Sequence, residues 1–512
     1  MASFGTELAT YLRAKYPLTY VVTNEERRVE REAAAVAASL GYETWLWSCV
    51  SGFTSPDGQE LNAANDPLQA LGIIKDAKRR VLYILRDYHP FLDVRTNPAN
   101  AVGVRALREL ARSLRSAPRE EARAVLFIAP VLVVPEELRT DVAVLEWALP
   151  TRAELRAAVV EITSALPPDV AANVTPETTD DVADGGVGLT LEEASDSVAR
   201  SLVATRGLDR SIVSREKKQA VARGGLLEWV EPSESLSSVG GYAALKSWLL
   251  EREKAFSPEA RAFGLPEPKG VLCVGVPGCG KSLLAKAVAT AWRRPLLRLD
   301  VGRLFGALVG QSESQLRAAL KTAEACAPCV LWLDEVEKAF AGMGSGAADG
   351  GTSTRVFGGF LTWMQERRSP APFVFATAND VSSLPPELLR KGRFDDVFFV
   401  DLPTPDERRD VWTAQFARYK QAVPADMSDL VGKSDGFSGA EIEAALVAAM
   451  FTAFASGSPL NATHVMGELA QTVPLSKTAA EKIDALRAWA KGRARNASST
   501  VAAGTSRRTL EL

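Results

Sequence analysis

The sequence predicts an α/β protein with two modules of the same kind, each a five-stranded parallel phosphate-loop sheet with a helical lid, the first degenerate and the second active. A glycine-rich phosphate-binding pattern occupies Gly275–Ser282, between an apolar run and a helical pattern. Further short apolar runs end in polar residues, as is typical of buried parallel strands. The same order of runs occurs twice along the chain, which predicts an internal repeat at domain scale.

The composition is that of an ordinary globular protein. The 512 residues are 46% hydrophobic and 24% charged, and the formal net charge is −3. This charge provides no basic field for nucleic acid, and no apolar run reaches the length of a membrane span, so we expect neither partner. Five cysteines suit a reducing compartment and the N-terminus has no secretory pattern, so we expect a cytoplasmic protein.

The phosphate-binding pattern reads GVPGCGKS and starts at Gly275. Its glycines let backbone amides wrap the phosphates, Lys281 can reach the β- and γ-phosphates, and the Ser282 hydroxyl can ligate Mg²⁺. A strand before it and a helix after it are the context that this motif requires. We therefore expect ATP and Mg²⁺ as ligands, with contacts from Pro277, Gly278, Cys279, Gly280, Lys281, Ser282 and Leu283.

Two further apolar runs bring polar side chains to the same edge of the predicted sheet. The run Val330–Leu333 ends in Asp334 and Glu335, and the run PFVFATA ends in Asn379. Ligands of parallel sheets bind at the carboxyl ends of the strands. We expect Asp334 to hold Mg²⁺ together with the serine, and Glu335 to orient or deprotonate the attacking water. Asn379 is expected to position that water or to sense the γ-phosphate.

Two arginines, Arg390 and Arg393, precede the fifth apolar run, in LLRKGRFDDVFFV. Guanidinium groups that meet the charge of a phosphoryl-transfer transition state often come from a neighbouring subunit. We expect both arginines to complete a nucleotide site, and the sequence leaves open which subunit's phosphate they meet.

Two matching stretches support the internal repeat. PEELRTDVAVLEWALPTRAEL starts at Pro135, and PELLRKGRFDDVFFVDLPTPDER starts at Pro386. Both run Pro-Glu-x-Leu-Arg, then a strand, then Leu-Pro-Thr and a helix start. Upstream, VLYILRDYHPF parallels VLWLDEVEKAF, and AVLFIAP parallels FVFATAN. We expect residues 1 to about 230 to form another module of this kind; an unrelated α/β domain with a convergent pattern is the alternative.

The first module lacks the chemistry of the second. Its turn NEER, which starts at Asn24, contains the carboxylates of Glu25 and Glu26 and has no glycine and no lysine. Two carboxylates there would repel a phosphate. We therefore expect a degenerate module that binds partners or stabilises a ring. Arg139 corresponds in sequence to Arg390, and without a nucleotide we expect it in a surface ion pair.

The chain from about residue 235 to residue 491 resembles an ATPase module of the AAA clade. The motifs that match are Walker A at Gly275–Ser282, Walker B at Asp334 and Glu335, sensor 1 at Asn379, and the arginines of the second region of homology at Arg390 and Arg393. Gly240 and Gly241 match the family's entry segment, whose backbone holds the adenine. Cys279 and Ser282 stand where the clade usually has threonines, and Ala440 stands where other branches carry a sensor-2 arginine.

Over nearly its full length the chain is similar to AAA ATPases encoded in algal plastids and cyanobacteria, which pair one active module with a divergent N-terminal region. YPLTYVVTNEERRVE and REKKQAVARGGLLEWVEP carry this resemblance. It makes the plastid stroma the alternative location to the cytoplasm.

The resemblance implies a homo-oligomeric ring, expected to be a hexamer, that hydrolyses ATP to remodel or disassemble a protein client. Residues 1–230 are candidates for recruiting that client. Leu308, Val309 and Gly310 correspond to the pore loop of the clade, with leucine in the aromatic position. Two alternatives stay open: a slow ATP-dependent switch or scaffold, and a nucleic-acid motor or loader, which the net charge disfavours.

We expect five segments along the chain. They are a degenerate α/β domain at 1–164, its helical lid at 165–230, a large ATPase domain at 231–403, its helical lid at 404–492, and a disordered tail at 493–512, where the composition becomes small and polar.

Overall fold

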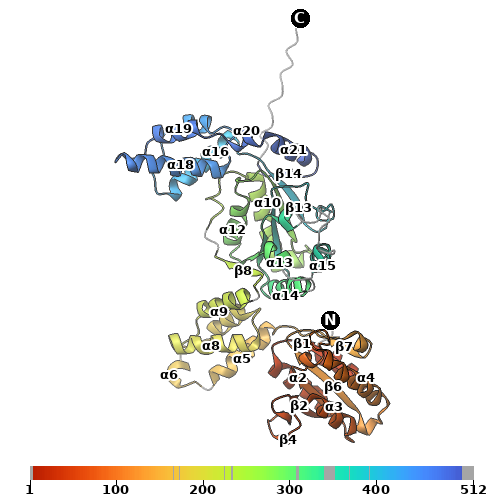
Figure 1. Ribbon diagram of the computed structural model, residues 1–512. Helices are drawn as coiled ribbons and strands as arrows, with labels where there is room; N and C mark the ends of the chain where they lie inside the picture. The colour runs from red at the N-terminus through yellow and green to blue at the C-terminus, as the bar shows by residue number, and fades with distance from the viewer. Residues whose placement is uncertain are drawn as a thin grey trace. The chain divides into compact units, whose positions relative to one another are not determined.

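The computed structural model describes residues 4–164, 166–171, 173–223, 225–231, 234–306, 311–339, 352–367, 370–390 and 392–498. The chain forms two compact units, Met1–Val213 and Ser214–Leu512, and each is built around a sheet of seven strands (Figure 1). No described helix is both long and apolar enough to cross a membrane.

The sheet of the first unit has the order β4-β3-β2-β5-β6-β1-β7. Its parallel strands are β2 (Glu43–Ser48), β5 (Val81–Arg86), β6 (Arg123–Ala129), β1 (Leu18–Val22) and β7 (Val142–Leu145). The antiparallel strands β3 (Gly52–Thr54) and β4 (Glu60–Asn62) extend the β2 edge. The helices of the α/β part are α1 (Phe4–Arg13), α2 (Glu26–Ser39), α3 (Pro67–Asp76) and α4 (Ala101–Ser116). The helical part consists of α5 (Arg152–Ser164), α6 (Pro168–Ala171), α7 (Pro176–Gly186) and α8 (Leu191–Thr205), and α9 (Arg210–Arg223) runs across the boundary between the two units.

The sheet of the second unit has the order β14-β13-β9-β12-β11-β10-β8. Its central parallel strands are β13 (Asp396–Val400), β9 (Gly270–Gly275), β12 (Phe373–Ala378), β11 (Val330–Leu333) and β10 (Leu296–Leu299). The helices of the α/β part are α10 (Ala243–Glu253), α11 (Pro258–Ala262), α12 (Lys281–Ala291), α13 (Val301–Gly306), α14 (Gln311–Ala325) and α15 (Thr352–Glu366). The later helices are α16 (Pro405–Arg418), α17 (Ser428–Lys433), α18 (Gly439–Ala455), α19 (Ala462–Gln471), α20 (Leu475–Thr478) and α21 (Ala480–Ala490).

The two units share one topology. When the five parallel strands of the first sheet and the five central parallel strands of the second are numbered along the chain, both sheets run 2-3-4-1-5. The prediction of two α/β modules is therefore confirmed. Each sheet has seven strands, the predicted five parallel strands and two more at its edges. These edges escaped the apolar pattern: the residues of β4 are all exposed, and β14 (Arg495–Asn496) has only two residues.

Two edge strands of the second sheet come from outside the predicted range 231–403. β8 (Leu227–Val230) pairs antiparallel with β10, although its residues fell in the predicted first lid. β14 pairs with β13, although its residues fell in the predicted tail. Arg495 lies 2.7 Å from the carboxylate of Asp396, and Ala497 is buried and donates to the carbonyl of Phe399. These contacts order the chain there, whereas residues 499–512 lie outside the described part.

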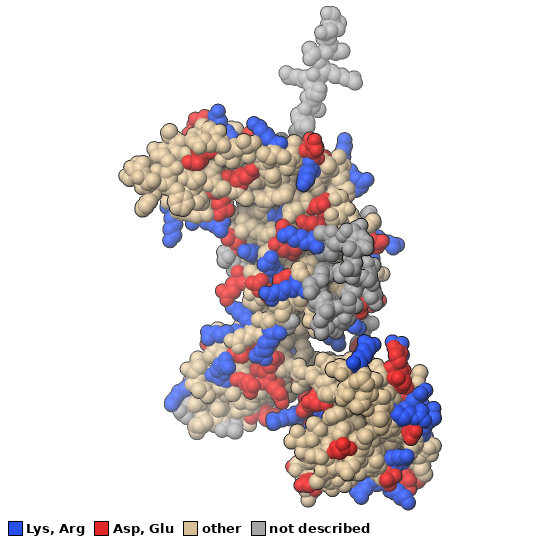
Figure 2. Space-filling model, viewed as in Figure 1, with Lys and Arg blue, Asp and Glu red and all other residues tan. Residues whose placement is uncertain are grey.

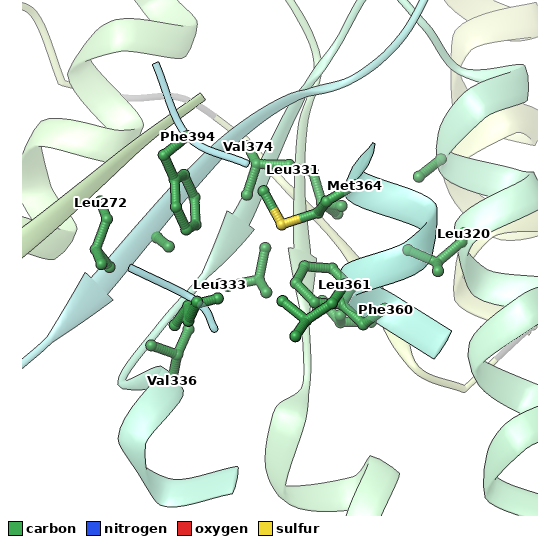
Figure 3. Close-up of a cluster of buried hydrophobic side chains, with 14 of the residues drawn as sticks. Leu272, Leu320, Leu331, Leu333, Val336, Phe360, Leu361, Met364, Val374 and Phe394 are labelled. Carbon is green, nitrogen blue, oxygen red and sulfur yellow. The ribbon is translucent and has the colours of Figure 1, made fainter. Parts of the chain in front are cut away.

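The core of the second module fixes the strand ends that carry the predicted site. Along β11, Leu331 and Leu333 face one side of the sheet, and Val330 and Trp332 face the other, as the pleat requires. On the first side they pack with Phe360, Leu361 and Met364 of α15, as Figure 3 shows. Each such burial contributes about 1.5–3 kcal/mol. Burial on both faces explains why β11 reads as a continuous apolar run.

Charged residues of both signs are mixed over the face shown in Figure 2. Among the described residues of that face, no large surface carries a single sign, in keeping with the small net charge.

Candidate functional site

The glycine-rich loop connects β9 to α12 at the centre of the second sheet. Gly278 and Gly280 both have positive φ, at 75° and 79°, a region that favours glycine. A Cβ on Gly278 would lie 3.0 Å from the Ser438 hydroxyl and 3.2 Å from the Cβ of Ala440. The N–H of Ala440 donates to the Gly278 carbonyl at 2.9 Å. The loop therefore meets the first turn of α18, where only a bare backbone fits.

Lys281 is the first residue of α12, and it is 6% exposed. Its Nζ donates to the carbonyl oxygens of Gly275 and Val276, at 2.9 and 2.8 Å. Burial lowers the pKa of Lys281. The ammonium group thus lies inside the loop, held by carbonyls that a phosphate oxygen can replace.

Asp334 follows β11 and receives two hydroxyl groups on one oxygen. Its Oδ1 accepts from Ser282 at 2.8 Å and from Thr377 at 2.7 Å. Arg298 lies 3.8 Å from its other oxygen. A hydroxyl and a carboxylate side by side are hard oxygen ligands of the kind that Mg²⁺ takes from proteins.

Glu335 adopts a left-handed conformation, with φ 50°. Its N–H donates to Thr377 Oγ1 at 3.0 Å, and its Oε1 accepts from the amide of Asn379 at 3.0 Å. Its Oε2 forms an ion pair with Lys338. Nearby, Glu337 accepts the backbone N–H of Asn379 at 3.0 Å, and burial raises the pKa of Glu337. The amide predicted as a sensor is therefore fixed by the carboxylates that follow β11.

A cavity of about 340 Å³ lies over these groups, within the size range of small-molecule sites. The predicted residues that line it are Gly240, Pro277, Gly278, Cys279, Gly280, Lys281, Ser282, Leu283, Asp334, Glu335 and Asn379. Residues that the sequence did not predict also line it, including Tyr242, Thr377, Val411, Gln415, Arg418 and Glu443. The glycine loop, a lysine and a hydroxyl–carboxylate pair fit a nucleotide phosphate with Mg²⁺.

Comparison with known proteins agrees with this geometry. Residues 4–147 match the model of the SpoVK-like AAA ATPase, N-terminal domain, and residues 271–402 match the AAA model, ATPase family associated with various cellular activities. A Guillardia theta protein, "Uncharacterized AAA domain-containing protein ycf46", is 37% identical over 497 residues, which cover 95% of each chain. The chain belongs to the ycf46 family of AAA domain-containing proteins.

A second member of the ycf46 family, from Pyropia yezoensis, is 36% identical over 507 residues, covering 97% of this chain and 100% of its own. The human ATPase family gene 2 protein homolog A is 32% identical over 231 residues, covering 42% of this chain and 25% of its own. The expected membership of the AAA ATPases is confirmed, and with it the resemblance of the N-terminal half to an AAA-type domain.

In this ycf46-family chain, the two glycines predicted to belong to the adenine-binding segment lie so close to their neighbours that a side chain would not fit. A Cβ on Gly240 would lie 2.7 Å from the backbone nitrogen of Val411. Gly241, with φ 76°, is not among the described lining residues, and a Cβ on it would lie 2.8 Å from Glu407 Oε1. Glu407 also accepts the N–H of Tyr242 at 3.0 Å. Glu407 therefore links this segment to α16, a role that no sequence motif indicated.

The remaining predicted residues lie elsewhere. Arg390 is exposed, and neither Arg390 nor Arg393 is among the described residues that line the cavity. Nη1 of Arg393 is buried and has no hydrogen-bond partner among the described residues. Leu308, Val309 and Gly310 lie outside the described residues, so their pore-loop assignment stays a prediction.

The corresponding turn of the first module is filled by its own side chain. Glu25 precedes α2 and is 3% exposed. Its Oε1 accepts the N–H of Leu191, the first residue of α8, at 2.7 Å. Its Oε2 accepts from Arg28 and from the Trp147 indole, both at 2.9 Å. A carboxylate therefore occupies the N-terminal end of a helix, where such an end would otherwise attract an anionic ligand.

The first lid meets this turn as the second lid meets the glycine loop. α8 begins with a capping box of Thr190 and Glu193, and α18 begins with one of Ser438 and Glu441. Both helices bond to the turn after the first parallel strand, one through Glu25 and the other through a glycine carbonyl. The sequence showed the two carboxylates of NEER, but it did not show that one of them, Glu25, would accept hydrogen bonds from its own module.

Proposed function

We propose that this chain binds ATP with Mg²⁺ in the cavity of the second module and hydrolyses it to ADP and phosphate. The observation that carries the proposal is the direct hydrogen bond between Ser282 and Asp334, at 2.8 Å, beside the loop that holds Lys281. This bond places a serine that follows a glycine–lysine loop beside an acid at a strand end, close enough for both to ligate one magnesium ion.

In this mechanism the loop amides and Lys281 bind the phosphates. Ser282 and Asp334 would hold Mg²⁺, which would supply positive charge against the phosphates. Glu335 accepts the proton of the attacking water, and Asn379 orients the Glu335 carboxylate through the 3.0 Å bond from its amide. Glu335 Oε2 forms an ion pair with Lys338, whose side chain is 68% exposed. Solvent can therefore replace the lysine readily.

We propose further that the chain acts as a homo-oligomeric ring, expected to be a hexamer, in which Arg390 and Arg393 complete a neighbour's site. Neither arginine is among the described residues that line the cavity of its own chain, which supports this assignment.

The proposed use of the cycle is to remodel or disassemble a protein client, recruited by residues 1–230, in the cytoplasm or the plastid stroma. The buried Glu25 supports a partner-binding or structural role for the first module, since its phosphate turn is filled.

Phosphate release from ATP tests the enzymatic part of the proposal. The wild-type chain should release phosphate with Mg²⁺ and stop when EDTA removes the metal. Lys281→Ala should abolish nucleotide binding and turnover, because the phosphates lose their buried ammonium partner. Turnover by Lys281→Ala at the wild-type rate would sink the proposal.

A further inference from the structure

The hydroxyl of Thr377 connects the two carboxylates of the site. Oγ1 donates to Oδ1 of Asp334 at 2.7 Å and accepts the backbone N–H of Glu335 at 3.0 Å. Thr377 lies on β12, which pairs with β11, the strand whose C-terminal end carries both acids. One side chain of the neighbouring strand therefore contacts two adjacent site residues.

The surroundings of Thr377 indicate that its hydroxyl does more than fill space in the core. β12 reads FVFATA, all six residues are buried, and Thr377 is its one polar side chain. A buried hydroxyl is unfavourable unless it is hydrogen-bonded. Valine has nearly the same shape and would fill the same space, so what the threonine adds is its two bonds to the site.

For Asp334, Thr377 is the donor that remains when a ligand binds. Oδ1 of Asp334 also accepts from Ser282 at 2.8 Å. The serine hydroxyl is the group expected to turn toward a metal ion, and this bond is then lost. The bond from Thr377 stays, because nothing in the proposed chemistry uses that hydroxyl.

For Glu335, Thr377 satisfies the backbone at a strained position. With φ 50°, Glu335 adopts a conformation that a residue with a side chain takes at a cost. Its N–H follows the end of β11, and Thr377 Oγ1 is its acceptor. The hydroxyl therefore stabilises the turn in which Asp334 and Glu335 diverge.

We propose that Thr377 is a positioning residue of the nucleotide site, which orients Asp334 toward the metal ion and holds the turn at Glu335. The inference rests on the proposed function of the second module. It predicts that loss of the Thr377 hydroxyl weakens metal binding in a chain that still folds.

The experiment uses the full chain as wild type, Thr377→Val, Thr377→Ser and the control Thr19→Val. Thr19 is also a buried strand threonine, and its hydroxyl donates to the carbonyl of Val125 at 3.2 Å, in the first module. Binding of Mn²⁺ in the presence of ADP is measured by electron paramagnetic resonance, and the Mg²⁺ dependence of ATP turnover is measured beside it.

Thr377→Val should weaken Mn²⁺ binding about tenfold or more and raise the Mg²⁺ concentration for half-maximal turnover by a similar factor, as loss of a metal-supporting partner does. Thr377→Ser should recover most of this loss, and Thr19→Val should behave as wild type. Unchanged Mn²⁺ binding in Thr377→Val would overturn the inference, as would an equal loss in Thr377→Ser or Thr19→Val. An inactive wild type would sink the proposed ATPase instead, and a Mn²⁺ difference would still support the positioning role.

Discussion

At the scale of single residues, the site is a set of polar groups that hold one another. Asp334 accepts two hydroxyls, and Glu335 is held by Asn379 and by Lys338. The bonds of Asp334 are partly buried, whereas the pair with Lys338 is exposed and screened by solvent. Glu335 can therefore leave the lysine for a water molecule while Asp334 stays fixed.

Cys279 should be unreactive in the folded chain, although it lies in the phosphate loop. It is 2% exposed, and burial raises the pKa of its thiol from 9.0 to about 12. A raised pKa favours the neutral thiol, so the nucleophilic thiolate is scarce at every pH well below 12. Iodoacetamide at pH 7.5, followed by mass spectrometry, should label the exposed Cys49 and leave Cys279 unlabelled. Equal labelling of the two cysteines would contradict this environment.

The site residues that the sequence predicted are those with a motif or a strand end to mark them. Lys281, Asp334 and Asn379 each follow an apolar run, and all three line the cavity. Thr377 was missed because its partners are 42 and 43 residues away in the chain, on a neighbouring strand end. One signal was present: Thr377 interrupts an otherwise apolar buried strand, and a buried hydroxyl needs partners.

At the scale of elements, the two lids use related helices for different contacts. The N-terminus of α18 meets a glycine loop that leaves room beside it for a ligand, whereas that of α8 is bonded to the Glu25 carboxylate. The first module therefore has an internal anion that ties its lid to its sheet. We expect that lid to stay closed with or without nucleotide.

Replacing Glu25 should loosen the start of α8. Hydrogen bonds to charged groups contribute about 1.5–3 kcal/mol, so in Glu25→Gln the amide of Leu191 should exchange about tenfold faster or more. Hydrogen exchange with mass spectrometry measures this, with α18 as the internal reference. Glu192→Gln is the matched control, because that carboxylate is 60% exposed and lies 4.0 Å from Arg27. If the amides of α8 exchange at the wild-type rate in Glu25→Gln, Glu25 does not hold the start of α8 in place.

Edge strands mark the limit of the sequence prediction at this scale. The central parallel strands β9, β11, β12 and β13 are apolar runs and were predicted from that pattern. β8 and β14 depend on pairing with β10 and β13, not on a pattern of their own. The position of Arg495 is decided by Asp396, 99 residues away, and composition alone suggested a tail there.

At the scale of the whole molecule, the chain has two modules of one topology and one module equipped for nucleotide. The glycine loop, the lysine and the acids occur in the second, and the first has Glu25 in the corresponding turn. The arginines offer a further contrast. Arg139, the counterpart of Arg390, forms a surface pair with Glu136 at 3.1 Å, with both side chains more than 70% exposed.

Arginine variants should reveal action between subunits. Arg390→Ala and Arg393→Ala should bind ATP but turn over about a hundredfold or more slowly, because their charge matters in the transition state. Mixing either variant with Lys281→Ala should restore part of the activity, since each chain supplies what the other lacks. Arg139→Ala is the control and should act as wild type. If stably mixed assemblies show no rescue, the arginines do not act across subunits.

The most direct test of one hydrolytic site per chain is the number of ATP molecules held by Glu335→Gln. This variant keeps the phosphate loop and the metal ligands but removes the proton acceptor, so bound ATP should persist. Equilibrium binding of radiolabelled ATP with Mg²⁺ to the full-length variant should give one nucleotide per chain, with hydrolysis slowed by roughly a hundredfold or more. Two nucleotides per chain would contradict the closed first module, and hydrolysis at the wild-type rate would contradict the role of Glu335.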